Sequence, residues 1–310
     1  MTRVAKVAAL SGGTGSAKFL RGLRNITKFT AIANVGDNAW FHGLYVCPDI
    51  DIVTYTLAGV ADAKKGWGIK DDEFRALGQL KRLRSEGTWF NIGDVDMGTH
   101  VFRTALMKKG KSLTEVTTTI ARRLGLRGST ILPATDEQVE THIITSEKGE
   151  MHLQEFWVKE KGRLTAKGVR YVGASKARAT AQVASSLLSS QRIVIAPGNP
   201  MTSVMPILSI GGFRGLLRKA KARKVAISPM VGERAFSGPA AELMAASGLE
   251  PTSEGVARLY RGLIDALIID ETDSAQARAI EGLGISCVRT STLMKTADDE
   301  VRLAKVAMEA

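Results

Sequence analysis

The feature that most constrains the fold of this chain is a strand–loop–helix pattern at residues 4–18, which read VAKVAALSGGTGSAK. A run of small and β-branched apolar residues ends at Leu10, three glycines follow within residues 12–15, and a helical pattern begins near Ala17. This order predicts a buried β-strand that leads through a tight loop into a helix. Such a unit is typical of the start of an α/β fold.

The glycine loop is also a candidate phosphate site. Gly12, Gly13, Thr14 and Gly15 would present backbone N–H groups and a helix N-terminus to an anion, with Lys18 one turn into the helix. The loop lacks the Gly-Lys-Ser/Thr ending of a Walker A motif, and Lys18 stands where a dinucleotide-binding fingerprint has its third glycine. The alternative is a strand-to-helix turn that binds no ligand.

Short buried-strand patterns recur along the rest of the chain, with helical segments between them. The expected strands lie at residues 30–34, 192–196, 224–228, 263–269 and 285–288. This alternation predicts an α/β fold, a Rossmann-like parallel sheet flanked by helices. Because the first two strands would be parallel, the loops that follow them should share one edge of the sheet, where open α/β sheets bind ligands.

One region changes character. Residues 139–145 and 151–159 alternate in polarity around a turn at 148–149, and residues 163–172 offer a further strand. We therefore predict an antiparallel β-hairpin region inserted at about residues 131–172. Since no repeat or linker interrupts the sequence, a single domain over residues 1–310 is expected.

Helices are expected between and after these strands. They lie at residues 70–84, 98–107, 113–124, 175–188 and from about residue 297, with a turn at residues 237–239. The sequence Ser112-Leu-Thr-Glu115 is a capping box, in which the two side chains and two backbone N–H groups satisfy one another at a helix start.

Two aspartates around a proline turn form the second candidate site. Asp49 and Asp51 follow Pro48, just before an apolar run at residues 52–57 that is typical of a helix. Such carboxylates can bind Mg²⁺, orient a hydroxyl group or cap the helix. A cap accounts for one aspartate and leaves the other unexplained.

Charge and composition narrow the functional classes. Lysine and arginine outnumber aspartate and glutamate by 43 to 31, a net charge of +12, which suits anionic ligands. The basic run at residues 214–224 carries no aromatic residues, so a nucleic-acid surface is not expected. No apolar run reaches the length of a membrane span. The only two cysteines, Cys47 and Cys287, lie far apart, which favours a reducing compartment, and we expect a cytoplasmic protein.

A colinear set of motifs covers nearly the whole chain. In order they are SGGTGSAKFLRGLR, ANVGDNAWFHGLYVCPDID, GWGIKDD, IGDVD followed two residues later by TH, LPATD, HLQEFWV, APGNPMTSVMPIL, ISPMVG and GPAAELM. This set resembles the 2-phospholactate transferase family of coenzyme F-420 biosynthesis. The resemblance implies a Rossmann-like, Mg²⁺-dependent enzyme and, as its quaternary state, a homodimer. It would move a 2-phospholactyl or enolpyruvyl phosphate group from a guanosine diphosphate-linked donor to the deazaflavin Fo and release GMP.

The resemblance also assigns candidate roles. Asp49 and Asp51 are the catalytic and Mg²⁺-binding candidates, and which of them binds the metal stays open. The expected donor-site residues are Gly12, Gly13, Thr14, Gly15, Lys18 and Asn199, although Asn199 also suits a turn. The expected Fo-site residues are Trp40, Pro48, Asp51 and Asn91.

Three departures affect the acceptor site. Asn91 stands where archaeal relatives tend to carry a basic residue, Val95 stands where arginine or lysine is frequent, and Ile52 replaces a common threonine.

Two other functions compete with the transferase. One is a nucleotide-sugar-binding regulatory protein of the related morphogenesis family, against which the Cys47-Pro-Asp-Ile-Asp51 turn argues. The other is a nicotinamide oxidoreductase, disfavoured by the missing third glycine and by the lack of an acidic residue at the end of the second strand. The choice between a lactyl and an enolpyruvyl donor also stays open, because the two differ by only one or two atoms.

Overall fold

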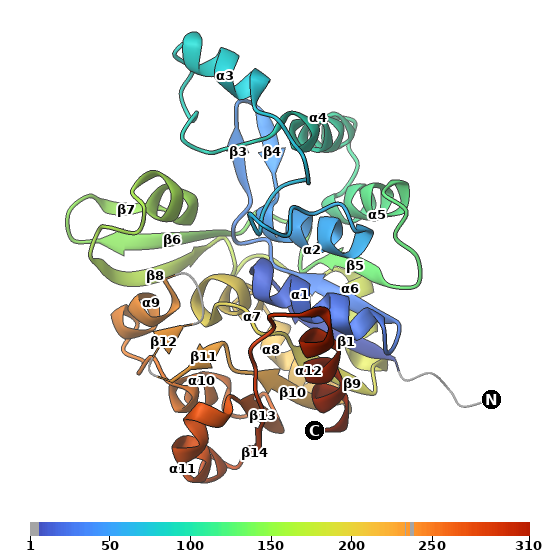
Figure 1. The fold of residues 1–310 in the computed structure, drawn as a ribbon, viewed down its shortest axis with the longest axis vertical. Coiled ribbons are helices and arrows are strands. Elements are labelled where there is room, and N and C mark those ends of the chain that lie inside the picture. The colour runs from blue at the N-terminus through green and yellow to red at the C-terminus, as the bar shows by residue number, and fades with distance from the viewer. Residues whose placement is uncertain (1–5, 233, 236–238) are drawn as a thin grey trace.

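A seven-stranded parallel β-sheet forms the centre of the molecule (Figure 1). The computed structural model describes residues 6–232, 234–235 and 239–310, and side chains in all of these except 234 and 235. The strand order is β14-β13-β10-β9-β1-β2-β5. The strands are β1 (Val7–Ser11), β2 (Phe29–Ala33), β5 (Thr130–Pro133), β9 (Arg192–Ile195), β10 (Arg223–Ile227), β13 (Ala266–Ile269) and β14 (Ser286–Arg289).

The strand order reverses direction at β1. From β1 the chain moves outward through β2 to β5, and it then returns to the other side of β1 with β9 and continues to β14. Val7 pairs with Phe29 on one side and with Arg192 on the other. The loops that follow β1 and β9 therefore diverge and leave a crevice at the carboxyl ends of the strands, where open α/β sheets bind ligands.

Burial explains the composition of the strands. All five residues of β1 and all four of β13 are buried, as expected for parallel strands with helices on both faces. The α-helices around the sheet are α1 (Gly13–Arg24), α2 (Pro48–Ala58), α3 (Arg75–Arg82), α4 (Asp94–Lys108), α5 (Leu113–Arg123), α6 (Ala181–Ser189), α7 (Met205–Leu208), α8 (Phe213–Lys219), α9 (Ala240–Ala246), α10 (Ser253–Tyr260), α11 (Ala277–Glu281) and α12 (Ala297–Glu309). Helix α1 packs between α2 and α12 (Figure 1).

A three-stranded antiparallel sheet stands beside the main sheet (Figure 1). It consists of β6 (Glu140–Thr145), β7 (Gly149–His152) and β8 (Ala166–Val172), with β6 in the middle. The expected start of this region at residue 131 is wrong, because β5 pairs in parallel with β2 in the main sheet. The strand expected at 151–159 is also largely wrong. It ends at His152, and Glu155–Lys159 form a π-helix, η1.

Two small hairpins and two further irregular helices complete the described chain. The hairpins pair β3 (Ala39–Phe41) with β4 (Leu44–Val46) and β11 (Met230–Val231) with β12 (Arg234–Ala235). The irregular helices are the π-helix η2 (Pro200–Val204) and the 3₁₀ helix η3 (Glu271–Gln276). Residues 237 and 238 of the turn expected at 237–239 lie outside the described residues.

Tertiary contacts move several predicted helix boundaries. Helix α3 begins five residues later than predicted, because Asp71 has a φ of +58°, outside the helical region, and the carboxylate of Asp94 accepts from the N–H groups of Arg75 and Ala76 at the helix start. Helix α4 begins four residues early, because the carboxylate of Asp72 caps its first turn from elsewhere in the chain. The helix expected at 175–188 begins only at Ala181.

The local start signals are confirmed where the capping partners are close in sequence. Ser112 and Glu115 form the predicted capping box of α5, and α12 begins at Ala297 as expected. Short-range hydrogen bonds of this kind depend on residues three positions apart, so the sequence pattern is sufficient to predict them.

The contact between α1 and α12 predicts a measurable glycine requirement. A Cβ atom at Gly22 would overlap the backbone of Glu300, whose carboxylate also accepts hydrogen bonds from Arg21 at 2.6 and 2.8 Å. Gly22→Ala should lower the free energy of unfolding by about 1–3 kcal/mol, because two helix backbones must separate. Urea unfolding at constant m-value measures this change.

Gly78 provides the matched control. It lies inside α3, and an added Cβ there would meet no atom within 4 Å. Gly78→Ala should therefore raise the free energy of unfolding by about 0.5–1 kcal/mol through helix propensity alone. Equal effects of the two substitutions would contradict the close helix contact at Gly22.

Candidate active site

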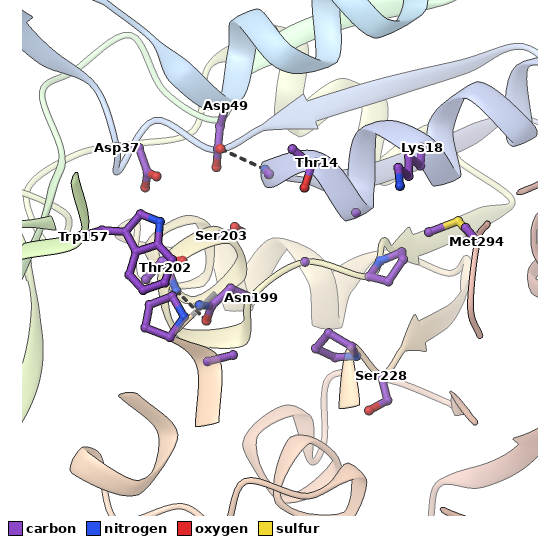
Figure 2. Close-up of a pocket in the computed structure, with 18 of the residues that line it drawn as sticks. Thr14, Lys18, Asp37, Asp49, Trp157, Asn199, Thr202, Ser203, Ser228 and Met294 are labelled. Carbon is purple, nitrogen blue, oxygen red and sulfur yellow. Dashed lines mark hydrogen bonds between the residues drawn. The ribbon is translucent and has the colours of Figure 1, made fainter. Parts of the chain in front are cut away.

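A cavity of about 390 Å³ opens at the crevice where the strand order reverses. Its walls come from the segments that follow β1, β2, β9, β10 and β14, and from α2, α9 and the β7–η1 region (Figure 2). The lining residues are Gly12, Gly13, Thr14, Gly15, Lys18, Asp37, Asp49, Leu153, Gln154, Trp157, Pro197, Gly198, Asn199, Thr202, Ser203, Ser228, Pro229, Val231, Pro239, Ala240, Thr292, Leu293 and Met294.

All of the residues predicted for donor binding line this cavity: Gly12, Gly13, Thr14, Gly15, Lys18 and Asn199. The first turn of α1 has backbone N–H groups without partners inside the helix, and it points toward the cavity (Figure 2). The sequence pattern therefore predicted which residues form this wall of the cavity.

Packing within the protein also requires glycines in this loop. Gly13 has a φ of +74°, in the left-handed region that favours glycine. A Cβ at Gly12 would lie 2.5 Å from Oδ2 of Asp49, and one at Gly15 would overlap the carbonyl oxygen of Pro197. The loop is thus glycine-rich partly because it packs against α2 and against the segment after β9.

Asn199 has a structural task in addition to its place in the wall. Its Oδ1 accepts from the N–H groups of Met201 at 2.9 Å and Thr202 at 3.3 Å and so caps η2. The oxygen is engaged in the turn, so a contact to a ligand would fall to the amide nitrogen of Asn199 (Figure 2).

Asp49 reaches from the first turn of α2 to the glycine loop. Its Oδ1 accepts from the N–H of Gly13 at 2.9 Å, and its Oδ2 accepts from Nδ2 of Asn34 at 2.9 Å. Burial raises the pKa of Asp49 to about 6, although both of these hydrogen bonds act to lower it. Asp49 therefore places a carboxylate directly at the N-terminus of α1.

Asp37 is a second carboxylate at the same end of the cavity (Figure 2). Its Oδ1 accepts from the same Nδ2 of Asn34 at 3.1 Å, and its Oδ2 accepts from Nε2 of Gln154 at 3.4 Å. Burial, and next the charge of Asp49, raise the pKa of Asp37 well above its usual range, against the effect of Asn34. Two buried like charges favour binding of a proton or a cation.

Asp51 belongs to a different environment. Its carboxylate pairs with both terminal nitrogens of Arg103, a fully buried side chain on α4, and Nη1 of Arg103 lies 3.0 Å from Nδ1 of His100. Residues two positions apart on a helix point in different directions, so Asp49 faces the cavity and Asp51 faces α4. The structure therefore does not bring the two predicted metal ligands together.

Asp37 and Asp49 are the residues that fit Mg²⁺. This ion prefers oxygen ligands and is commonly held by one or two carboxylates together with waters and substrate phosphates. In the described part of the chain, no three His, Cys, Asp or Glu side chains are arranged to hold a metal. The remaining ligands would therefore be substrate oxygens and water.

The residues predicted for Fo are not gathered at one place. Trp40 is 51% exposed and lines a separate groove of about 700 Å³, whereas Pro48 and Asn91 line neither this groove nor the cavity. We call this second depression the aromatic groove. It is lined by Ala39, Trp40, Phe41, His42, Glu86, Gly87, Trp89, His152, Glu155 and Lys159.

Sequence reasoning missed Asn34, Asp37, Gln154 and Arg103 as site or network residues. The sequence could have indicated Asn34 and Asp37, because both lie within four residues after β2 and the loops after β1 and β2 were expected at one edge of the sheet. No local pattern marks Gln154 or Arg103, since their partners are 117 and 52 residues away in sequence.

Comparison with known proteins identifies the family. Residues 7–297 match the family described as 2-phospho-L-lactate transferase CofD. The chain belongs to this family. It is 42% identical over 305 residues to the 2-phospho-L-lactate transferase of Methanopyrus kandleri. The alignment covers 97% of this chain and 96% of that protein.

Other relatives carry two different names. The 2-phospho-L-lactate transferase of Methanosarcina mazei is 38% identical, covering 97% of this chain and 98% of its own. The phosphoenolpyruvate transferase of Mycobacterium avium is 35% identical, covering 91% of this chain and 92% of its own. As a CofD family member, the chain is a transferase of coenzyme F-420 biosynthesis, as the motifs predicted.

Solved structures support the fold. A member of the upf0052 family from Bacillus halodurans superposes with a TM-score of 0.68 at 16% identity, over 99% of this chain and 100% of that one. This likeness confirms the predicted Rossmann-like α/β fold of the CofD family member. Within the described ranges, no helix combines the length and apolar character that crossing a bilayer requires.

The different surroundings of the two aspartates predict unequal effects of their substitution on stability. Asp51→Asn leaves the fully buried Arg103 without a charged partner, so the free energy of unfolding should fall by about 3 kcal/mol or more. Asp49→Asn removes a carboxylate whose ionisation burial disfavours, but its NH₂ group would face the N–H of Gly13 or Nδ2 of Asn34, so stability without ligand should fall by less than in Asp51→Asn. Denaturant unfolding of both variants measures this, and equal losses would contradict the assignment.

The raised pKa of Asp49 predicts a pH-dependent response to Mg²⁺. Its pKa in the folded protein, about 6, exceeds the unfolded value, so its contribution to stability is present at low pH and is lost as the pH rises through 6. Mg²⁺ needs ionised carboxylates and should recover that loss. Thermal shifts with MgCl₂ should therefore be larger at about pH 8 than at about pH 5. Asp49→Asn should abolish the difference, and an equal shift at both pH values would argue against this site.

Proposed function

We propose that this enzyme transfers a 2-phospholactyl or enolpyruvyl phosphate group from a guanosine diphosphate-linked donor to a hydroxyl group of the deazaflavin Fo, with Mg²⁺. The products are GMP and an Fo phosphodiester, F-420-0 or its dehydro form. The observation that carries the proposal is one cavity that combines the N-terminus of α1 with two buried carboxylates, Asp37 and Asp49. The names of the relatives supply the transferred groups.

The charges at this wall favour a diphosphate together with a divalent cation. Asp49 occupies the first N–H of α1, so an anion that approached this helix alone would meet a carboxylate. A cation between the carboxylates and the phosphates converts this repulsion into attraction. When bound, Mg²⁺ would stabilise charge that develops on the phosphoryl oxygens. Lys18, on the cavity side of α1, supplies a further positive charge (Figure 2).

The chemistry requires positioning more than a covalent intermediate. The acceptor hydroxyl oxygen forms a bond to the phosphorus that carries the three-carbon acid, the bond from that phosphorus to the bridging oxygen breaks, and GMP leaves. The hydroxyl proton is released in the same reaction. Phosphoryl transfer of this kind depends chiefly on in-line placement and on electrostatic stabilisation. The N–H groups of α1 and the amide of Asn199 line the cavity and would orient the donor.

The aromatic groove is the acceptor site in this proposal. Trp40 and Trp89 offer flat apolar surfaces for a deazaflavin ring, and Lys159 lies 5.8 Å from the ring centre of Trp89. The segment 152–159 separates the groove from the cavity. His152, Glu155 and Lys159 line the groove, and Leu153, Gln154 and Trp157 line the cavity. Ring and phosphates would thus bind on two sides of one wall.

Two further expectations from the sequence accompany this proposal. We expect the enzyme to act as a homodimer and to work in the cytoplasm. Both stay predictions. The sequence leaves the lactyl and the enolpyruvyl donor as alternatives, because they differ by only one or two atoms of the three-carbon acid.

A direct assay tests the function. Purified protein with Fo, MgCl₂ and each guanosine diphosphate-linked donor should release GMP and an Fo product of the corresponding mass, detected by mass spectrometry. Asp49→Asn should reduce turnover by about 10²-fold or more, the scale for losing one transition-state electrostatic contact. Gly78→Ala lies in helix α3, which lines neither the cavity nor the aromatic groove, and should leave turnover unchanged.

Two other outcomes would contradict parts of the proposed function. Binding of uridine diphosphate sugars in a thermal-shift assay, with no GMP release from either donor, would favour the regulatory-protein alternative. Normal turnover in a folded Asp49→Asn protein would instead leave the reaction in place and remove Asp49 from it.

A further inference from the structure

Asn34 lies where three walls of the cavity meet. It follows β2 directly and is fully buried. Its Nδ2 donates to Oδ1 of Asp37 at 3.1 Å, to Oδ2 of Asp49 at 2.9 Å and to the carbonyl oxygen of Thr202 at 2.9 Å. These acceptors belong to the loop after β2, to α2 and to η2. One side-chain amide therefore links the three segments.

The orientation of the amide follows from its partners. Oδ1 of Asn34 accepts from the N–H of Gly36 at 2.9 Å, which only an oxygen can do. A flipped amide would place its oxygen against two carboxylates and a carbonyl group, all of which are acceptors. The NH₂ group therefore faces Asp37 and Asp49, and its two hydrogens serve three acceptors.

A neutral donor suits this place better than a charged one. Two buried carboxylates repel each other, and hydrogen bonds from a shared donor reduce that repulsion. A lysine or arginine would also cancel the negative charge and would compete with a cation. The amide of Asn34 holds both carboxylates in place and leaves their charge available.

We propose that Asn34 is a positioning residue. It sets the relative placement of Asp37 and Asp49 for a divalent cation and links both carboxylates to the cavity wall at Thr202. This inference rests on the metal site of the proposed function. Hydrogen-bonding partners behind metal ligands orient those ligands, and their loss typically weakens metal binding by about 10- to 100-fold. Asn34 touches neither substrate nor metal in this role and acts through the two carboxylates.

Metal binding without substrate provides the test. The wild-type protein and Asn34→Ala are titrated with MgCl₂ or MnCl₂ by calorimetry, at a temperature where circular dichroism shows both to be folded. Asn34→Ala should raise the dissociation constant by about 10- to 100-fold. In the transfer assay, the KM for Mg²⁺ should rise in the same proportion while kcat at saturating Mg²⁺ changes much less.

Thr104→Val separates positioning from a general loss of stability. Oγ1 of Thr104 accepts from the N–H of Tyr45 at 2.8 Å, is buried in α4, and lies outside the lining of the cavity. This variant keeps the side-chain shape and removes one buried hydrogen bond. It should lower the melting temperature yet bind Mg²⁺ like the wild type.

A second variant guards against misfolding of the first. Asn34→Ser keeps one donor hydrogen and should fold more readily, with metal binding still weaker than in the wild type. Wild-type metal affinity in either folded variant would overturn the inference and leave the proposed function intact. Failure of both variants to fold would also overturn it, because Asn34 would then be required for the fold itself. A wild-type protein that binds no metal would overturn both the metal site and this inference.

Discussion

Two buried carboxylates with raised pKa values, Asp37 and Asp49, share one amide donor, and Asp49 also accepts from the first N–H of α1. This arrangement is electrostatically unfavourable unless a proton or a cation joins it. The surrounding structure maintains it nonetheless, through the N–H of Gly13, Nε2 of Gln154 and the buried Asn34. The cavity owes its character to this constraint. In the proposed function it would attract a cation and, together with the cation, phosphates.

The reversal of strand order at β1 makes such an arrangement possible. The loops after β1 and β9 diverge there, so that α1 and η2 can both face the crevice while β2 delivers Asn34 and Asp37 to its side. Gly12 lets α2 approach closely enough for Asp49 to reach the backbone of Gly13, and Gly15 lets the segment after β9 approach the start of α1. The site is therefore a property of sheet topology as much as of any single motif.

A second buried network explains why neighbouring aspartates differ in role. Asp51 and Arg103 join α2 to α4 through an ion pair that is removed from water, and His100 lies against the same guanidinium group. This pair fixes the first turn of α2, from which Asp49 extends. The same short turn thus carries one aspartate for the cavity and one for the attachment of the helix.

The sequence by itself determined the α/β fold, the glycine loop, most strands of the sheet and the family, because these depend on short-range patterns and on colinear motifs. It also placed Gly12–Gly15, Lys18 and Asn199 at one edge of the sheet, since the carboxyl ends of parallel strands meet there. Only the tertiary structure separated Asp51 from Asp49, added Asp37 through Asn34, and started α4 early under the carboxylate of Asp72. These outcomes depend on side-chain directions and on partners distant in the chain, which no local pattern records.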